Sequence, residues 1–79
     1  MLKAKERFYF DAGKMPAKIA MAEVSEISGY YAMIDCYIKD DNGSYKPIIT
    51  VKILAKICHQ TARKYIADTA AIHAEHYHA

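Results

Sequence analysis

The stretch YYAMIDCYIKDDNGSYKPIITVKI, residues 30–53, decides the fold because it contains two alternating segments around a turn signal. Its first half alternates between an apolar face and a mixed face, the first made of Ala32, Ile34, Cys36 and Ile38 and the second of Tyr31, Met33, Asp35 and Tyr37. A period of two is typical of a strand with one buried face. In the DDNG sequence, Asn42 and Gly43 tolerate positive φ, and residues 48–53 then alternate again. We therefore predict a β-hairpin, with Pro47 near the start of its second strand or on an unpaired side.

Two flanking segments extend this hairpin into a domain. In RFYFDA, Phe8 and Phe10 alternate with polar or amphipathic neighbours, which indicates a first strand. From about Leu54 to Tyr77, no glycine or proline interrupts a long helical pattern. Its apolar stripe recurs in steps of three and four through Leu54, Cys58, Thr61, Ala62, Tyr65, Thr69, Ile72 and His76. We expect this stripe to pack on the sheet, with Cys58 in the core.

Residues 16–28 admit two interpretations. A run rich in alanine and methionine, with Pro16 in the first turn and Gly29 as a stop, favours a helix. The alternative is a strand from Lys18 to Ile27 that turns into the hairpin. The favoured fold is therefore β-α-β-β-α, a small two-layer α+β sandwich in which an antiparallel sheet carries a long C-terminal helix on one face. The alternative order is β-β-β-β-α, with four strands in the sheet.

Length and composition limit the class of protein. Seventy-nine residues, of which 53 % are hydrophobic and 25 % charged, predict one folded domain over residues 1–79. The net charge of +2 is too small to indicate a general attraction to nucleic acid or to anionic membranes. The charged N-terminus does not resemble a secretory signal, and no segment has the length and apolar character of a membrane helix. We expect a cytoplasmic protein that does not bind membranes.

No motif in the chain predicts catalysis or a cofactor. Cys58 and His59 are neighbours in sequence, but adjacent helical positions point about 100° apart, so they do not form a nucleophile and base pair. We expect a protein that is not an enzyme and that binds no cofactor. His73 and His76, one helical turn apart, are weak candidates for metal ligands, because a structural zinc site needs four ligands.

The mixed face of the sheet is the predicted functional surface. The predicted interface consists of Tyr9, Tyr30, Tyr31, Met33 and Tyr37, an aromatic set with few charges that is typical of protein-binding surfaces. We predict a non-catalytic binding or inhibitor-type domain that contacts another protein through this face or through a sheet edge, and that self-associates as a homodimer if the partner is its own copy.

A nucleic-acid-binding module is the alternative function. Basic residues on the hairpin and the last helix would contact phosphates in this interpretation, namely Lys39, Lys46, Lys52, Arg63 and Lys64. A third expectation, an accessory protein of a phage or mobile element, rests only on the frequency of small non-catalytic domains among such proteins.

Overall fold

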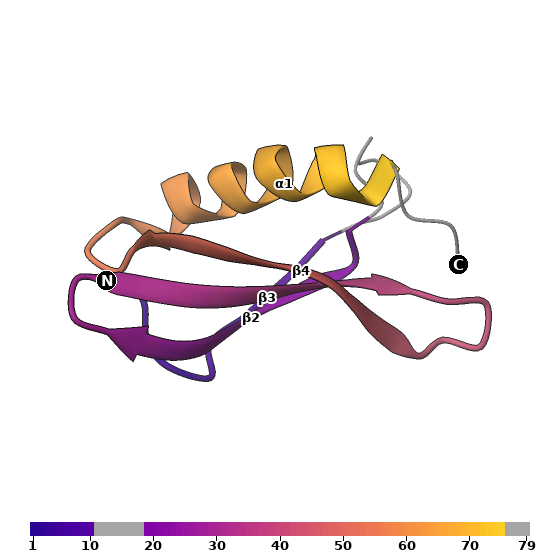
Figure 1. The fold of residues 1–79 in the computed structure, drawn as a ribbon, viewed down its shortest axis with the longest axis horizontal. Helices are drawn as coiled ribbons and strands as arrows, with labels where there is room; N and C mark the ends of the chain where they lie inside the picture. Colours follow the sequence, from indigo (N-terminus) through magenta and orange to yellow (C-terminus); the bar gives the residue numbers. More distant parts are fainter. Residues whose placement is uncertain (11–18, 76–79) are drawn as a thin grey trace.

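The computed structural model describes residues 1–10 and 19–75, which form a four-stranded antiparallel sheet with one helix across one face (Figure 1). The elements are β1 (Arg7–Tyr9), β2 (Met21–Ser28), β3 (Tyr31–Lys39), β4 (Tyr45–Leu54) and α1 (His59–Glu75). Each strand pairs with its neighbour in the chain, in the order β1-β2-β3-β4. The α+β two-layer fold is confirmed, in its alternative β-β-β-β-α form.

The predicted hairpin is formed by β3 and β4. Its turn is held by Asp40, whose Oδ1 accepts hydrogen bonds of 2.9 Å from the backbone N–H groups of Asn42 and Ser44. Gly43 has a φ of 85°, a conformation that favours glycine. The register shifts between Cys36 and Tyr37, so that one extra β4 residue lies next to Pro47. Such a β-bulge accommodates a proline that cannot donate to the ladder.

The favoured helix over residues 16–28 is wrong where the structure describes it, because Met21–Ser28 is strand β2. Residues 16–18 lie outside the described residues. β2 pairs on one side with β1 and on the other with β3, so its backbone hydrogen bonds and burial outweigh the weak helix propensity of its residues. Its alternation is also hidden by a bulge between Val24 and Glu26, which places Val24 and Ile27 on the same face although they are three residues apart.

The core lies between the sheet and α1. Ile34 in the middle of β3 is fully buried, and its cross-strand neighbours Val24 and Val51 are also buried. The alternation predicted for β1 and β3 is confirmed, since Phe8 and Phe10 are buried while Tyr9 is exposed, and the even-numbered residues of β3 from 32 to 36 face the core. The pattern of burial therefore follows the period of two wherever no bulge interrupts it.

The helix begins later than predicted, at His59, and buries a different stripe. Its buried side chains among the described ones are those of Ala62, Ile66 and Ala70, with Ile66 fully buried. Tyr65, which the predicted stripe contained, is 45 % exposed, and Cys58 is exposed rather than in the core. The predicted stripe differs from the observed one because it was counted from Leu54, which belongs to strand β4 and not to the helix.

The start of α1 also holds the N-terminal segment and the outer side of β1. Arg63 donates a hydrogen bond to the carbonyl of Tyr9 and lies over the ring of Phe10, with its guanidinium carbon 4.5 Å from the ring centroid. His59 Nε2 lies 2.5 Å from Glu6 Oε2. Leu2 is fully buried, and its N–H donates to the Ala55 carbonyl. Leu2, Phe8 and Phe10 therefore anchor the first ten residues to the core.

Candidate protein-binding site

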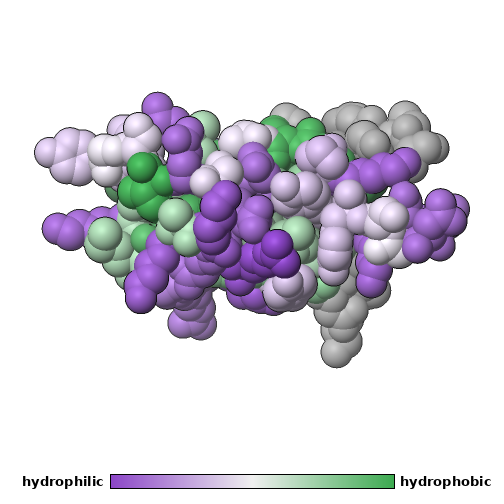
Figure 2. Space-filling model, turned by 90° about the horizontal axis from the view of Figure 1, so that it is seen from below, coloured by the Kyte–Doolittle hydropathy of each residue, from purple (hydrophilic) through white to green (hydrophobic). Residues whose placement is uncertain are grey.

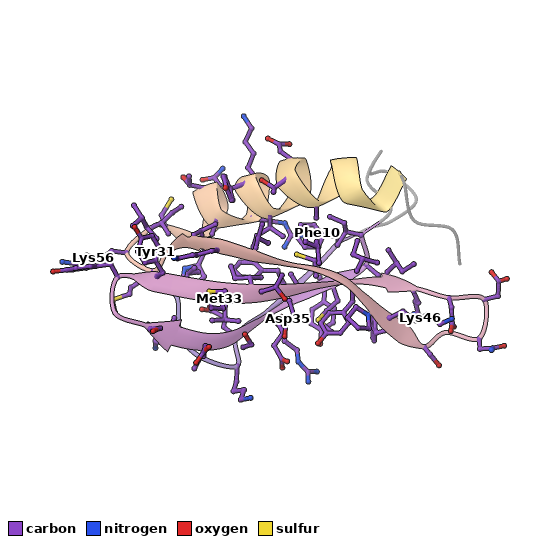
Figure 3. The ribbon with its side chains drawn as sticks, in the orientation of Figure 1. Phe10, Tyr31, Met33, Asp35, Lys46 and Lys56 are labelled. Carbon is purple, nitrogen blue, oxygen red and sulfur yellow. The ribbon has the colours of Figure 1, made fainter. Side chains whose placement is uncertain are left out.

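The face of the sheet opposite α1 is crossed by a row of polar and charged side chains. The row runs through Arg7, Glu23, Asp35 and Thr50, which are cross-strand neighbours on the four strands. Arg7 Nε donates to Glu23 Oε2 at 3.0 Å, and Thr50 Oγ1 donates to Asp35 Oδ1 at 2.7 Å. The face opposite α1 therefore carries more charge than the predicted aromatic residues alone indicate. Met33 and Asp35 lie near the middle of the sheet, as Figure 3 shows, so the row divides the predicted surface.

Tyr9 and Tyr37 lie on one side of this row. They are the cross-strand neighbours of Met21, which is 6 % exposed although it faces away from α1. Desolvation raises the pKa of Tyr37, and the nearby Asp35 carboxylate acts in the same direction. These two tyrosines flank and cover a methionine, so half-buried Tyr37 in particular has a structural role in addition to the predicted one.

Tyr30 and Tyr31 lie on the other side, at the end of the sheet where β2 turns into β3. Several large apolar side chains from distant parts of the chain gather there around Leu54, which is 55 % exposed. Two hollows of about 410 and 310 Å³ open on either side of it and share it as a wall. We call this surface the Leu54 patch and define it by Met1, Tyr30, Tyr31, Leu54, Ile57 and Tyr65.

The charges around the Leu54 patch are positive. Lys52 Nζ lies 4.4 Å from the centroid of the Tyr31 ring, in a cation–π contact, and Lys56 lines the larger hollow. Tyr31 and Lys56 lie at the same end of the molecule (Figure 3), and from below the same end shows a hydrophobic group within a mostly hydrophilic face (Figure 2). The hollows contain no acidic side chain among the described residues. The patch is thus apolar with a basic rim.

Sequence reasoning found two of the six residues of the Leu54 patch and missed four. Tyr30 and Tyr31 were predicted, whereas Met1, Leu54, Ile57 and Tyr65 were not. A signal for Leu54 existed, because continuing the alternation of β4 by one residue beyond Ile53 places it on the face of Lys52. Met33 of the predicted set lies between Glu26 and Lys52 on the same face and is half-buried.

The five basic residues of the nucleic-acid alternative are spread over the molecule. Lys39 and Lys46 lie at the far end of the β3–β4 hairpin, where Lys46 Nζ is 3.8 Å from Asp40 Oδ2. Lys52 lies near the opposite end over Tyr31, and Arg63 is engaged by the carbonyl of Tyr9. Lys64 is exposed on α1. These positions do not form one continuous basic surface.

The nearest approach to a reactive cluster lies at the start of α1. Cys58 Sγ is 3.0 Å from Thr61 Oγ1, and hydrogen bonds from the side chain and backbone of Thr61 lower the pKa of this thiol. The neighbouring His59 is engaged by Glu6 instead of by the thiol. Desolvation acts to raise the pKa of Glu6, but hydrogen bonds from the Lys3 N–H and from His59 outweigh it, so the pKa is lowered. His59 is therefore not placed to act as a general base for Cys58.

The predicted metal candidates are only partly described. His73 lies in the last turns of α1, and His76 lies outside the described residues. Among the side chains that the structure describes, which end at residue 70, no three His, Cys, Asp or Glu converge on a point where they could bind a metal ion. The helix that the structure describes is neither long enough nor apolar enough to cross a membrane.

Comparison of the chain with protein-family models, with curated proteins and with solved structures gave no match.

Proposed function

We propose that this protein is a non-catalytic binding domain that docks another protein on its Leu54 patch. The observation that supports this proposal is the convergence of large, exposed apolar side chains from four separate segments on one end of the sheet. Exposed apolar side chains scattered singly need no explanation, whereas a contiguous group with a charged rim is typical of interaction sites.

The composition of the patch supports binding to a protein. Tyrosine and methionine are enriched where interfaces are fully desolvated, and they provide a large contact area. Tyr30 is 84 % exposed and Leu54 is 55 % exposed, so neither side chain contributes most of its apolar area to the core. The hollows beside Leu54 are large enough to receive side chains of a partner, with Lys52 and Lys56 available at the rim.

A capture experiment with matched variants tests the proposal. The tagged protein is incubated with lysate from its native source, and bound proteins are quantified by mass spectrometry. We expect Leu54→Arg to reduce capture of specific partners at least about tenfold, because it places a charge in the centre of an apolar contact. Tyr45→Ser is the control, since Tyr45 has a similar exposure of 41 % but lies at the hairpin end.

Two results would contradict the proposal. The Leu54 patch would be excluded as the binding site if the wild-type protein and Leu54→Arg captured partners equally and circular dichroism showed that both were folded. Salt-sensitive retention on labelled oligonucleotides that is lost when Lys46 and Lys64 become glutamate would favour the nucleic-acid alternative. Light scattering across a concentration series identifies the case in which the bound protein is a second copy of this chain.

A further inference from the structure

The outer edge of β4 is open where it borders the Leu54 patch. The Ala55 N–H donates to the Tyr30 carbonyl at 2.8 Å, and the register pairs Ile53 with Ala32. Hydrogen-bonded and non-bonded residue pairs alternate in an antiparallel ladder. Because Ala55 and Ile53 belong to the bonded pairs with β3, the backbone N–H and C=O groups of the alternate residues, Thr50, Lys52 and Leu54, point away from β3. In the part of the chain that the structure describes, no backbone group outside the ladder bonds to these three residues. This edge can accept another strand.

The opposite edge of the sheet is different. β1 has three residues, and Phe10 donates its N–H to Ala20 of the neighbouring segment, so the carbonyl of Tyr9 points outward. Arg63 from α1 donates to this carbonyl. The β1 edge is therefore short and partly capped. The ten-residue β4 edge is protected near its start by Pro47 and the bulge beside it, and by the charge of Lys52 further along, but no other part of the described chain covers its backbone at residues 50–54.

The smaller hollow of the Leu54 patch lies along this open edge. Its walls include Lys52 and Leu54 from the face opposite α1, and Ile53, Ile57 and Tyr65 from the α1 side. Because side chains of alternating β4 residues point to opposite faces, a hollow that both faces line follows the outer side of the strand. A strand added to β4 would place its side chains against both walls.

The positive charges beside the β4 edge favour one kind of binding partner over another. Lys52 is exposed on the edge and Lys56 follows just beyond it, with no acidic side chain in either hollow among the described residues. A second copy paired through the same segment would bring like charges together around a two-fold axis, which is unfavourable. An acidic side chain opposite Lys52 gains instead from the opposite charge.

We propose that the β4 edge binds an extended segment of another protein as a fifth antiparallel strand. The segment carries, from its N- to its C-terminal side, an apolar residue opposite Leu54, an apolar residue opposite Ile53 and an acidic residue opposite Lys52. Main-chain hydrogen bonds provide the binding and these side chains provide the selectivity, as in other cases of strand addition. This inference rests on the proposed function, because it specifies how the Leu54 patch is occupied.

A display experiment with a random heptapeptide library on the immobilised protein tests the selectivity. We expect the selected peptides to share the order apolar, apolar, acidic. Synthetic copies are then N-methylated one residue at a time. Methylation opposite Lys52 or Leu54 removes a bonded N–H and weakens binding about tenfold, whereas methylation opposite Ile53 leaves it within about twofold.

Two pairs of protein variants test the edge itself. Thr50→Pro removes an outward N–H without removing a β3 hydrogen bond, and Thr50→Ala is its control, since both lose the same hydroxyl bond to Asp35. We expect the proline variant alone to lose peptide binding about tenfold. Lys52→Glu should weaken binding of the acidic peptides about fivefold, and Lys52→Ala should weaken it less.

The outcomes separate this inference from the proposed function. Strand addition would be overturned if peptide binding required Leu54 but was unchanged by Thr50→Pro and by N-methylation at every peptide position. Docking on the Leu54 patch would then still stand. Selection of basic peptides, or of none, would also overturn it. So would a wild-type dimer that Thr50→Pro converts to monomer, because the occupant would then be a second copy.

Discussion

Replacing Ile66 by alanine tests the packing of α1 on the sheet. Ile66 is fully buried, and its buried neighbours in the helix stripe, Ala62 and Ala70, are small. The change removes three carbon groups at about 0.8 kcal/mol each, and the cavity left behind raises the cost to about 3 to 4 kcal/mol. A domain of this size has about 3 to 5 kcal/mol available from its core, so the variant should be largely unfolded or marginal. Urea unfolding followed by circular dichroism measures the difference.

Tyr65→Ala is the matched control for this experiment. It removes a larger side chain from the adjacent position, but Tyr65 is 45 % exposed, so we expect a loss of about 1 kcal/mol or less. The reasoning would be refuted if the two variants lost equal stability, or if Ile66→Ala lost less than about 1 kcal/mol, because the helix would then be held by other contacts.

The remaining predictions concern titrating groups. Ellman's reagent at about pH 8 should modify only Cys58 in the folded protein, because hydrogen bonds from Thr61 lower its pKa, whereas burial and the nearby Asp35 raise the pKa of Cys36 to about 12. Cys58→Ser should leave no reactive thiol until denaturant is added, and rapid labelling of that variant would contradict the assignment. For Glu6, the folded pKa lies below its ordinary value of 4.5, so its contribution to stability is present above that pH and is lost as pH falls through the folded pKa. The stability difference between wild type and Glu6→Gln, measured by urea unfolding, should therefore shrink on acidification, and a difference independent of pH would disprove the role of this carboxylate.

The strands were predictable wherever burial follows an uninterrupted period of two. Phe8 and Phe10, and the core face of β3, show this pattern directly in the sequence. β2 was not predictable in this way, because its bulge separates Val24 from Ile27 by three residues, a spacing that also suits a helix. Its strand conformation depends on partners on both sides, which propensity does not measure.

The candidate site was predicted less well than the fold. The sequence shows which residues of β3 face away from the core, but not that Arg7 and Glu23 meet Asp35 across the sheet and divide that face. Met1 and Tyr65 belong to the Leu54 patch only because the N-terminus and α1 reach the same end of the sheet. Such long-range contacts leave no periodic signal in a single sequence.

The attachment of the N-terminal segment has a consequence for folding during synthesis. β2, β3 and β4 are joined by short turns and can pair in the order in which they are made. β1 can also pair early with β2, but the partners of the first ten residues at the start of α1 come much later, since Arg63 is 54 positions after Tyr9. At about 5 to 20 residues per second, translation leaves the outer side of β1 without this partner for about 3 to 11 seconds. The first-made part of the chain therefore completes its contacts only after the start of α1 has been made.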